Sequence, residues 1–233
     1  MIIRLDWDSN FFGVETGKLV VEENQIIDSA NFNEFDFVYI FSDLKLSEEQ
    51  LKIKTGKIHL ADQKVVYHKF LKESSEISAD VHSFDKNRSI PERLYDLAIQ
   101  SGHYSRFSTD SNISRSPFER LYKIWLERSV SRDIADEVYV YETDDLVRGF
   151  ITLGIKSGRP DIGLVAVNPK DRSLGIGALL LQASENWALT QKNCHEIQVV
   201  TQGENKGACR FYEKNGYSID SVTYIYHWWN NKS

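Results

Sequence analysis

The chain has 233 residues, of which 41% are hydrophobic and 27% are charged, the balance of an ordinary globular protein with a sizeable core. Its formal net charge of −6 excludes a global basic field that would attract nucleic acid or anionic membranes. Only two cysteines occur, no apolar run is long enough to span a bilayer, and the first residues do not resemble a signal peptide. We therefore expect a cytoplasmic protein without a disulfide framework.

The first third of the chain is rich in β-branched and aromatic residues. This pattern predicts two strands, over residues 35–41 and 64–70, and a short helix over residues 47–54. The polar segment 72–80 is the best candidate for a linker. We expect a smaller N-terminal α/β domain over residues 1–75 and a larger domain over residues 76–233.

Two helices with Ser-x-x-Glu starts are predicted next. Ser89-Ile90-Pro91-Glu92 has a capping-box pattern, with Ser89 as the N-cap of a helix that ends near Gly102. Ser116-Pro117-Phe118-Glu119 repeats the pattern, with Pro117 at the first helical position. The second helix has one apolar face, formed by Phe118, Leu121, Tyr122 and Trp125.

The rest of the chain alternates strands and helices. Strand-like runs are predicted over residues 137–141, 147–155, 161–167 and 195–201, with a turn at Asp144-Asp145 and a break at Gly158-Arg159-Pro160. A long helix has an apolar face formed by Ile176, Leu179, Leu180, Ala183 and Trp187, and a second helix over residues 205–214 ends at Gly216. An aromatic pair of strands over residues 217–229 closes the chain. This order predicts a mixed α/β layout around one sheet.

A strand, a glycine-bearing turn and a helix start follow one another over residues 162–178. The turn has the pattern Arg172-x-x-Gly175-x-Gly177. Its glycines let the backbone approach a bulky group, and the first helical turn offers unpaired N–H donors and the positive end of the helix dipole. A diphosphate fits such a turn, and Arg172 could add a charged contact. The turn lacks the Gly-Lys-Ser/Thr element of a P-loop and the three-glycine dinucleotide fingerprint. A lone glycine turn can also be only a tight strand–helix connection.

This motif resembles the Arg/Gln-x-x-Gly-x-Gly/Ala signature of the GNAT acetyltransferases. A second matching element lies downstream, Asn205-x-x-Ala208-x-x-Phe211-Tyr212-Glu213-Lys214-x-Gly216-Tyr217. The resemblance covers residues 89–229, and the order of the elements agrees throughout. It implies the GNAT fold, a mixed, mostly antiparallel sheet flanked by helices, with acetyl-CoA as co-substrate.

The resemblance also implies roles for individual residues. Backbone groups of the strand would pair with the pantetheine arm of acetyl-CoA, at Leu164, Val165 and Val167. Backbone N–H groups of the turn would hold the pyrophosphate, at Leu174, Gly175, Ile176, Gly177 and Ala178. Asn205 would contact the cofactor near its pantetheine end, and Tyr212 would lie beside the thioester sulfur.

Tyr212 is the candidate catalytic residue. Attack of an amine on a thioester expels a thiolate, and a positioned phenol can give that thiolate a proton. The alternative is a core aromatic residue, because Tyr212 lies on an apolar helix face with Phe211. Cys209 should point away from Tyr212 and is an unlikely nucleophile. The general base is not identified, although water could link the amine to Asp161 or Glu204.

A narrower resemblance concerns the acceptor. The opening Leu5-Asp6-Trp7-Asp8-Ser9-Asn10-Phe11-Phe12-Gly13-Val14 and the stretch Tyr104-Ser105-Arg106-Phe107 resemble bacterial TDP-fucosamine acetyltransferases. These acetylate the 4-amino group of a TDP-linked amino-deoxy sugar. Trp7, Phe11, Tyr104 and Arg106 would then bind the substrate, with the N-terminal domain on the substrate side. The insertion Val-Asn-Pro-Lys-Asp before Arg172 departs from those enzymes. Core packing of the aromatic residues and a surface ion pair of Arg106 are the alternatives.

Other partners and functions are constrained less directly. The six histidines lack the paired spacings of metal ligands, so we expect no metal, and the aromatic C-terminal run lacks the basic residues of a nucleic-acid platform. A protein N-terminus or a small polyamine stays open as the acceptor, and so does transfer of acyl groups other than acetyl. A non-catalytic acyl-CoA-binding module is the alternative from another class, and a homodimer stays open.

Overall fold

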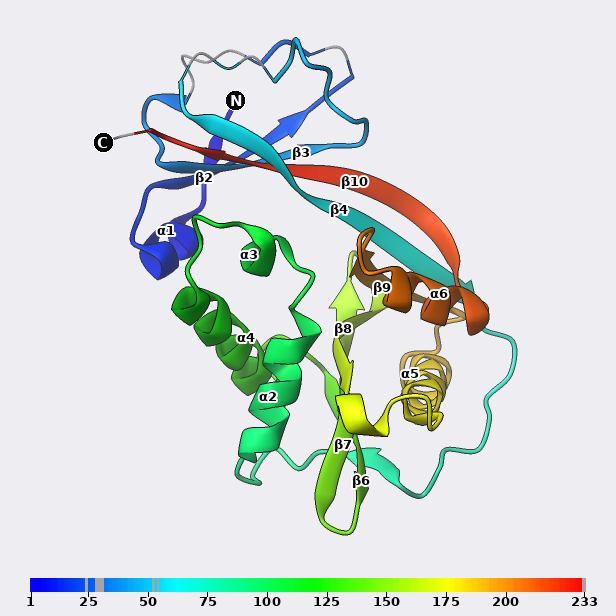
Figure 1. Ribbon diagram of the computed structural model, residues 1–233. Coiled ribbons are helices and arrows are strands. Elements are labelled where there is room, and N and C mark those ends of the chain that lie inside the picture. Colours follow the sequence, from blue (N-terminus) through cyan, green and yellow to red (C-terminus); the bar gives the residue numbers. More distant parts are fainter. Residues whose placement is uncertain (24, 28–31, 52, 54, 232–233) are drawn as a thin grey trace. The chain divides into compact units, whose positions relative to one another are not determined.

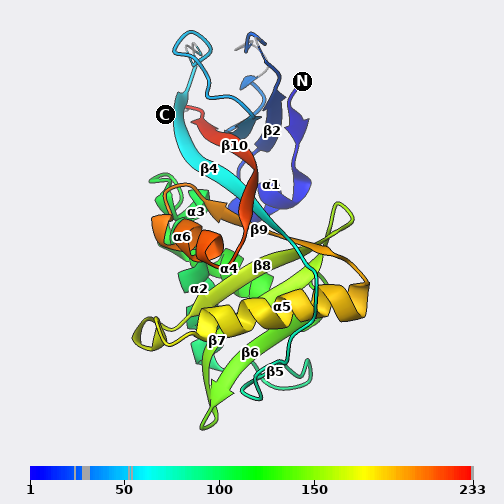
Figure 2. The ribbon, with the colours of Figure 1, turned by 90° about the vertical axis from the view of Figure 1, so that its right-hand side faces the viewer.

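The computed structural model describes residues 1–23, 25–27, 32–51, 53 and 55–231, which form two compact units (Figures 1 and 2). The first unit comprises Met1–Val65, Gln202–Glu204 and Ser221–Ser233, and the second comprises Val66–Thr201 and Asn205–Asp220. The division into domains at residue 75 stays a prediction about folding units, because compactness in space is a different property from independent folding.

The first unit is built on a sheet with strand order β1-β2-β3-β10-β4. Its members are β1 (Ile3–Arg4), β2 (Thr16–Val21), β3 (Phe37–Ser42), the start of β4 (Lys57–Phe70) and most of β10 (Ser218–Trp229). β2 runs parallel to β3, whereas β10 runs antiparallel to it, with Ile225 opposite Phe41. The helix α1 (Asp6–Phe12) follows β1.

Alternation along β3 and β10 gives this sheet two packed faces. On one face Val38, Ile40, Tyr226 and Trp228 form a buried cluster, and the Trp228 indole N–H donates to the Thr55 carbonyl at 2.6 Å. On the other face Phe37 stacks on Trp229, with 3.8 Å between the ring centroids. The aromatic C-terminal run is therefore a core strand, as its composition predicts.

The second unit is built on a sheet with strand order β4-β9-β8-β7-β6-β5. Besides the end of β4, its strands are β9 (Glu196–Gln202), β8 (Arg159–Val167), β7 (Leu146–Lys156), β6 (Glu137–Thr143) and β5 (Val81–Ser83). From β5 to β8 each strand is antiparallel to the next, and β8 and β9 are parallel. The sheet is thus mixed and mostly antiparallel, as predicted.

Helices cover both faces of this sheet (Figure 2). α2 (Glu92–Ser101) and α4 (Arg115–Val130) bury Leu94, Leu97 and Leu126 in one cluster with Phe150 of the sheet. α5 (Ile176–Lys192) lies on the opposite face, where a Cβ on Gly149 would stand 3.1 Å from both Ile176 and Leu180. The short helices α3 (Arg106–Thr109) and α6 (Lys206–Lys214) complete the unit. The predicted α/β fold class is confirmed.

The predicted N-caps of two helices are each wrong by two residues, in opposite directions. α2 is capped by Pro91 and not by Ser89, because the residue before a proline resists the helical conformation and Ile90 therefore stays outside. α4 is capped by Ser114 and not by Ser116. An ion pair of 2.6 Å from Arg115 to Glu119, one turn apart, supports the earlier start.

Three other predicted features also differ. Residues 47–51 form a single turn closed by the Leu51 N–H on the Ser47 carbonyl at 3.1 Å, and not the start of a helix; residues 52 and 54 lie outside the described part. The predicted pair of strands at the C-terminal end is one strand, β10. The polar residues at its start belong to the strand, and one of them, Asp220, forms an ion pair with Arg159 at 3.1 Å. Arg159 and Pro160 were predicted to lie in a break before the strand, but they are the first two residues of β8.

Candidate active site

β8 pairs with its two neighbouring strands over different lengths. It pairs with β7 along its whole length, from Arg159 to Val167, whereas its parallel pairing with β9 covers only Asp161 and Ile162. Between these ends Gly163 and Leu164 lie opposite the single residue Thr152, which makes a β-bulge. From residue 163 to residue 167, β8 does not pair with β9. We call this side of the strand the open edge of β8.

The backbone of β8 is oriented toward this open edge. The Asn168 N–H donates to the Arg148 carbonyl at 2.8 Å, so alternation directs the backbone groups of Val165 and Val167 away from β7. The Val167 carbonyl already accepts the Gln100 side chain at 3.0 Å and Arg172 Nε at 3.2 Å. The N–H groups of Val165 and Val167 therefore point where an added extended chain could pair.

The glycine turn lies between the end of β8 and α5. Ser173 and Gly175 both have positive φ, 64° and 87°, and a Cβ on Gly175 would meet nothing within 4 Å. The Ala178 N–H already donates to the Gly175 carbonyl at 2.9 Å, whereas the N–H groups of Gly175 to Gly177 precede the first intrahelical bonds. Open space beside these donors, at the positive end of a 17-residue helix, fits an anionic group such as a diphosphate.

α6 packs against this turn and joins the two sequence motifs. A Cβ on Gly177 would stand 3.0 Å from the Phe211 ring, so α6 packs tightly on the turn at this position and a larger residue would require the Phe211 ring to shift. Asn205 caps α6, because its Oδ1 accepts the Ala208 N–H at 3.1 Å. This cap leaves the Asn205 amide N–H₂ as the donor that could reach a ligand.

Tyr212 lies on the inner face of α6 among other phenols. Its side chain is buried, with ring centroids 5.8 Å from those of Tyr67 and Tyr217. Burial, together with the nearby Cys209, raises the pKa of Tyr212, so the phenol stays protonated at neutral pH. The prediction that Cys209 points away from Tyr212 is wrong, because Cys209 is close enough to raise the pKa of Tyr212, as residues three apart on one helix face can be.

Burial also raises the pKa values of Tyr67 and Tyr217. Tyrosines in an unfolded chain have a pKa of about 10. Above that pH the unfolded chain therefore releases protons that these two groups still hold in the folded chain. The contribution of these two tyrosines to the free energy of unfolding should be constant below about pH 10 and fall above it. Urea unfolding from pH 8 to pH 11 measures this slope, and Tyr217→Phe should make it shallower. An unchanged slope in that variant would contradict the assignment.

A cavity of about 270 Å³ opens beside the bulge. Thr152, Lys156, Asp161 and Gly163 line it, together with the segment 134–135 that precedes β6. The Asp161 carboxylate accepts Gln198 Nε2 at 2.9 Å, which fixes its orientation. The cavity therefore combines a carboxylate and an ammonium group at the point where the backbone of β8 changes course.

The predicted acceptor residues divide between the two units. In the first, Trp7 stacks on Phe11 with centroids 5.0 Å apart, and Trp7 is half exposed. In the second, Tyr104 is half exposed and the Arg106 guanidinium lies 4.3 Å from the ring centroid of Phe107. That these four residues bind one substrate stays a prediction.

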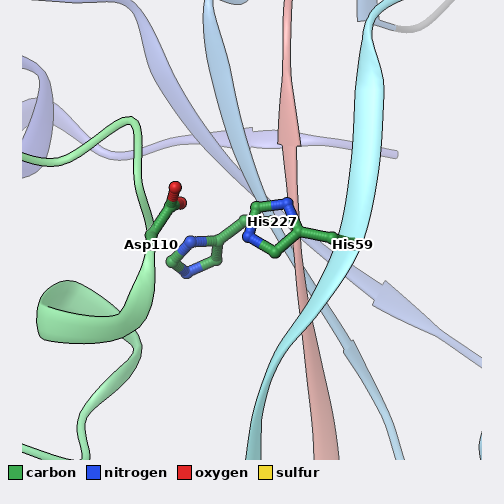
Figure 3. Close-up of side chains that lie close together, drawn as sticks. All are labelled: His59, Asp110 and His227. Atoms are coloured by element: carbon green, nitrogen blue, oxygen red, sulfur yellow. The ribbon is translucent and has the colours of Figure 1, made fainter.

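His59 and His227 of the first unit lie side by side, with ring centroids 5.9 Å apart (Figure 3). Their separation in the sequence gave no sign of this proximity. Asp110, also drawn in Figure 3, belongs to the second unit.

Four residues near the candidate site were not predicted: Tyr67, Gln100, Thr152 and Asp171. Three of them approach it from β4, α2 and β7, far away in the sequence, so no local pattern could identify them. Asp171 directly precedes Arg172 of the glycine-turn motif, so its position in the sequence could have pointed to it.

Residues 102–217 match the family model of the acetyltransferase (GNAT) family. This segment contains the β8 bulge, the glycine turn and α6, and it belongs to the GNAT family. Within it, an acetyl-CoA site is the arrangement that the open edge of β8 and the turn fit.

Two relatives match parts of the chain. An uncharacterized N-acetyltransferase of Methanocaldococcus jannaschii is 38% identical over 79 residues, 34% of this chain and 51% of the relative. The spore coat polysaccharide biosynthesis protein SpsD of Bacillus subtilis is 25% identical over 141 residues, 60% of this chain and 48% of the relative. The chain thus spans about half the length of each of these relatives.

A solved structure shares the fold over most of the chain. A GCN5-related N-acetyltransferase from Kribbella flavida superposes with a TM-score of 0.50 at 13% identity, covering 94% of this chain and 82% of that one. At this identity the likeness concerns the fold alone. Among the helices of the described residues, none is both long and apolar enough to cross a membrane.

Proposed function

We propose that the protein is an acetyl-CoA-dependent N-acetyltransferase that moves an acetyl group directly to an acceptor amine. One observation carries the proposal: the open edge of β8 leads from the bulge to the glycine turn, against which α6 packs Phe211, the neighbour of Tyr212. A non-catalytic acyl-CoA-binding module would need the edge and the turn but not a buried phenol on the adjoining helix.

The cofactor residues would divide the ligand between them. Val167 would offer its backbone N–H to a pantetheine amide, in the manner of an added strand, while the Val165 N–H would face the acetyl oxygen. Residues 174–178 would face the diphosphate, with Arg172 at the rim and the Asn205 amide near the pantetheine end.

Acetyl-CoA, when bound, supplies an acetyl group activated as a thioester. The Val165 N–H is the donor placed to stabilise negative charge on the acetyl oxygen as the amine attacks. The Tyr212 phenol, with its raised pKa, would hold its proton and donate a hydrogen bond to the departing sulfur. An ordinary thiol has a pKa of about 8.5, so full proton transfer from Tyr212 would be uphill and the hydrogen bond is its main contribution.

The acceptor amine would enter through the cavity beside the bulge. An amine arrives mostly as an ammonium ion, and the Asp161 carboxylate, held by Gln198, is the group that could attract it and pass its proton to water. At about 270 Å³ the cavity would hold the amine-bearing end of a large acceptor, and the rest of the acceptor would lie outside it.

For the acceptor itself we infer a nucleotide-linked amino sugar, the 4-amino group of a TDP-linked amino-deoxy sugar. The N-terminal resemblance supports this class, and the name of SpsD places that relative in polysaccharide biosynthesis. Trp7, Phe11 and Tyr104 would supply aromatic faces for thymine or the deoxysugar, and Arg106 would offset the diphosphate charge that a net-acidic protein repels.

The test is release of coenzyme A from acetyl-CoA by the full chain. The assay compares a TDP-linked 4-amino-4,6-dideoxyhexose, the same sugar without its nucleotide, a peptide with a free N-terminus, and spermidine. We expect turnover with the sugar nucleotide and at least about tenfold lower kcat/KM with the free sugar, because the nucleotide contacts are lost.

Other outcomes of this assay are equally informative. Turnover with the peptide or with spermidine alone would keep the acetyltransferase and remove the sugar. Binding of acetyl-CoA with no turnover on any amine would favour the acyl-CoA-binding module.

A further inference from the structure

Asp171 is a buried carboxylate at the entrance to the glycine turn. It ends the 3₁₀ helix of Pro169–Asp171 and directly precedes Arg172. Its side chain accepts a hydrogen bond from the Asn168 amide, pairs with Arg148 at 3.0 Å and lies 3.7 Å from Arg93. These hydrogen bonds, first that from Asn168 and then that from Arg148, keep the pKa of Asp171 below its usual range.

The partners of Asp171 come from the rigid parts of the unit. Arg148 lies on β7, and its Nε also donates to the Thr143 hydroxyl at 2.6 Å, so its guanidinium is held on two sides. The Arg148 carbonyl in turn accepts the Asn168 N–H at 2.8 Å. Arg148 thus ties both ends of the segment 168–171 to the central sheet.

This tie determines the direction of the residues that follow. Ser173 and Gly175 have positive φ, and no neighbouring atom lies within 4 Å of the position of a Gly175 Cβ. The turn is therefore open on its ligand side, and its backbone has to be fixed by contacts on the opposite side. A charge-assisted pair in a buried position is more directional than apolar packing, and it suits this purpose.

We propose that Asp171 and Arg148 are positioning residues that hold the backbone N–H groups of the glycine turn in place for the diphosphate of the acyl carrier. The inference rests on the proposed function, because it takes coenzyme A as the ligand. Neither residue needs to touch that ligand.

The test compares Asp171→Asn with a matched control, Glu142→Gln. Glu142 also pairs with an arginine, Arg88, at 2.7 Å, and the side chains of Glu142 and Asp171 are 9% and 11% exposed. Glu142 lies on β6, outside the glycine turn, so both variants lose a similar ion pair and only one loses the tie.

Calorimetry with coenzyme A, urea unfolding and amide hydrogen exchange are measured on the full chain. We expect both variants to unfold at lower urea, but only Asp171→Asn to bind coenzyme A roughly tenfold more weakly, the factor of one charge-assisted hydrogen bond. Exchange at residues 174–177 should rise in Asp171→Asn alone. Arg148→Lys, which keeps the charge but not the planar fork, should give the same pattern if Asp171→Asn fails to fold.

Two results would overturn the proposal. One is a folded Asp171→Asn or Arg148→Lys protein with coenzyme A affinity within twofold of the wild type. The other is equal loss of affinity in Glu142→Gln, which would make the effect one of general stability. If the wild type binds no coenzyme A, the proposed function fails, and hydrogen exchange of the ligand-free turn still decides whether the pair positions it.

Discussion

Replacing Gly175 with aspartate is expected to weaken coenzyme A binding by about 100-fold or more. Gly175 has a φ of 87°, a conformation that costs an L-residue about 1–2 kcal/mol. The space at its Cβ position is open, so the new side chain can extend toward the side where the diphosphate is proposed to lie. Like charges repel there, and the strained backbone no longer holds the N–H groups in place. Isothermal titration calorimetry with coenzyme A measures the loss.

The chain offers a closely matched control in Gly158→Asp. Gly158 also has a positive φ, 79°, and open space around its Cβ position, but it lies in the turn between β7 and β8. It therefore adds the same charge and a similar backbone strain away from the glycine turn. Unchanged affinity in Gly175→Asp, or an equal loss in Gly158→Asp, would remove the diphosphate from this turn.

The glycine turn could be predicted because its signals are local. Positive φ at Gly175 and the start of α5 depend on a few consecutive residues, and the apolar face of α5 repeats with the helical period, so Ile176, Leu180, Ala183 and Trp187 are all buried. Such elements can be predicted because they depend on residues that are close together in the sequence.

The open edge of β8 could not be predicted in the same way. It results from a bulge opposite Thr152 and from a pairing with β9 that stops after two residues, and both depend on strands distant in the sequence. The partnership of Tyr67 with Tyr212 is similarly non-local, because β4 and α6 are far apart along the chain. Sequence patterns indicated each strand but not where neighbouring strands separate.

Short polar segments were the other source of error. Residues 47–51 carry a helical pattern but form one turn, because so short a segment forms too few hydrogen bonds to repay the cost of nucleating a helix. The boundaries of α2 and α4 moved for related reasons, since several serines and a proline compete for the cap position.

Tyr212→Phe is expected to keep the fold and the affinity for coenzyme A while lowering kcat by about 10²-fold, the lower end of the range for proton-donor assistance. The reason is that only the hydroxyl is removed, and that group is proposed to act on the sulfur as negative charge develops, so the loss falls on kcat and not on KM. Because burial raises the pKa of Tyr212, its ionisation should not limit kcat of the wild type at any pH below about 10.

The matched control is Tyr217→Phe, which also removes a buried hydroxyl from the same aromatic group, 5.8 Å away between ring centroids. Steady-state kinetics with the best amine from the acceptor assay should give Tyr217→Phe nearly normal kcat and Tyr212→Phe the full loss. Equal kcat in the wild type and Tyr212→Phe would make Tyr212 a packing residue. The departing sulfur would then leave without a hydrogen bond from Tyr212, and the open edge of β8 would be left as the main source of rate enhancement, through positioning of the thioester and the Val165 N–H.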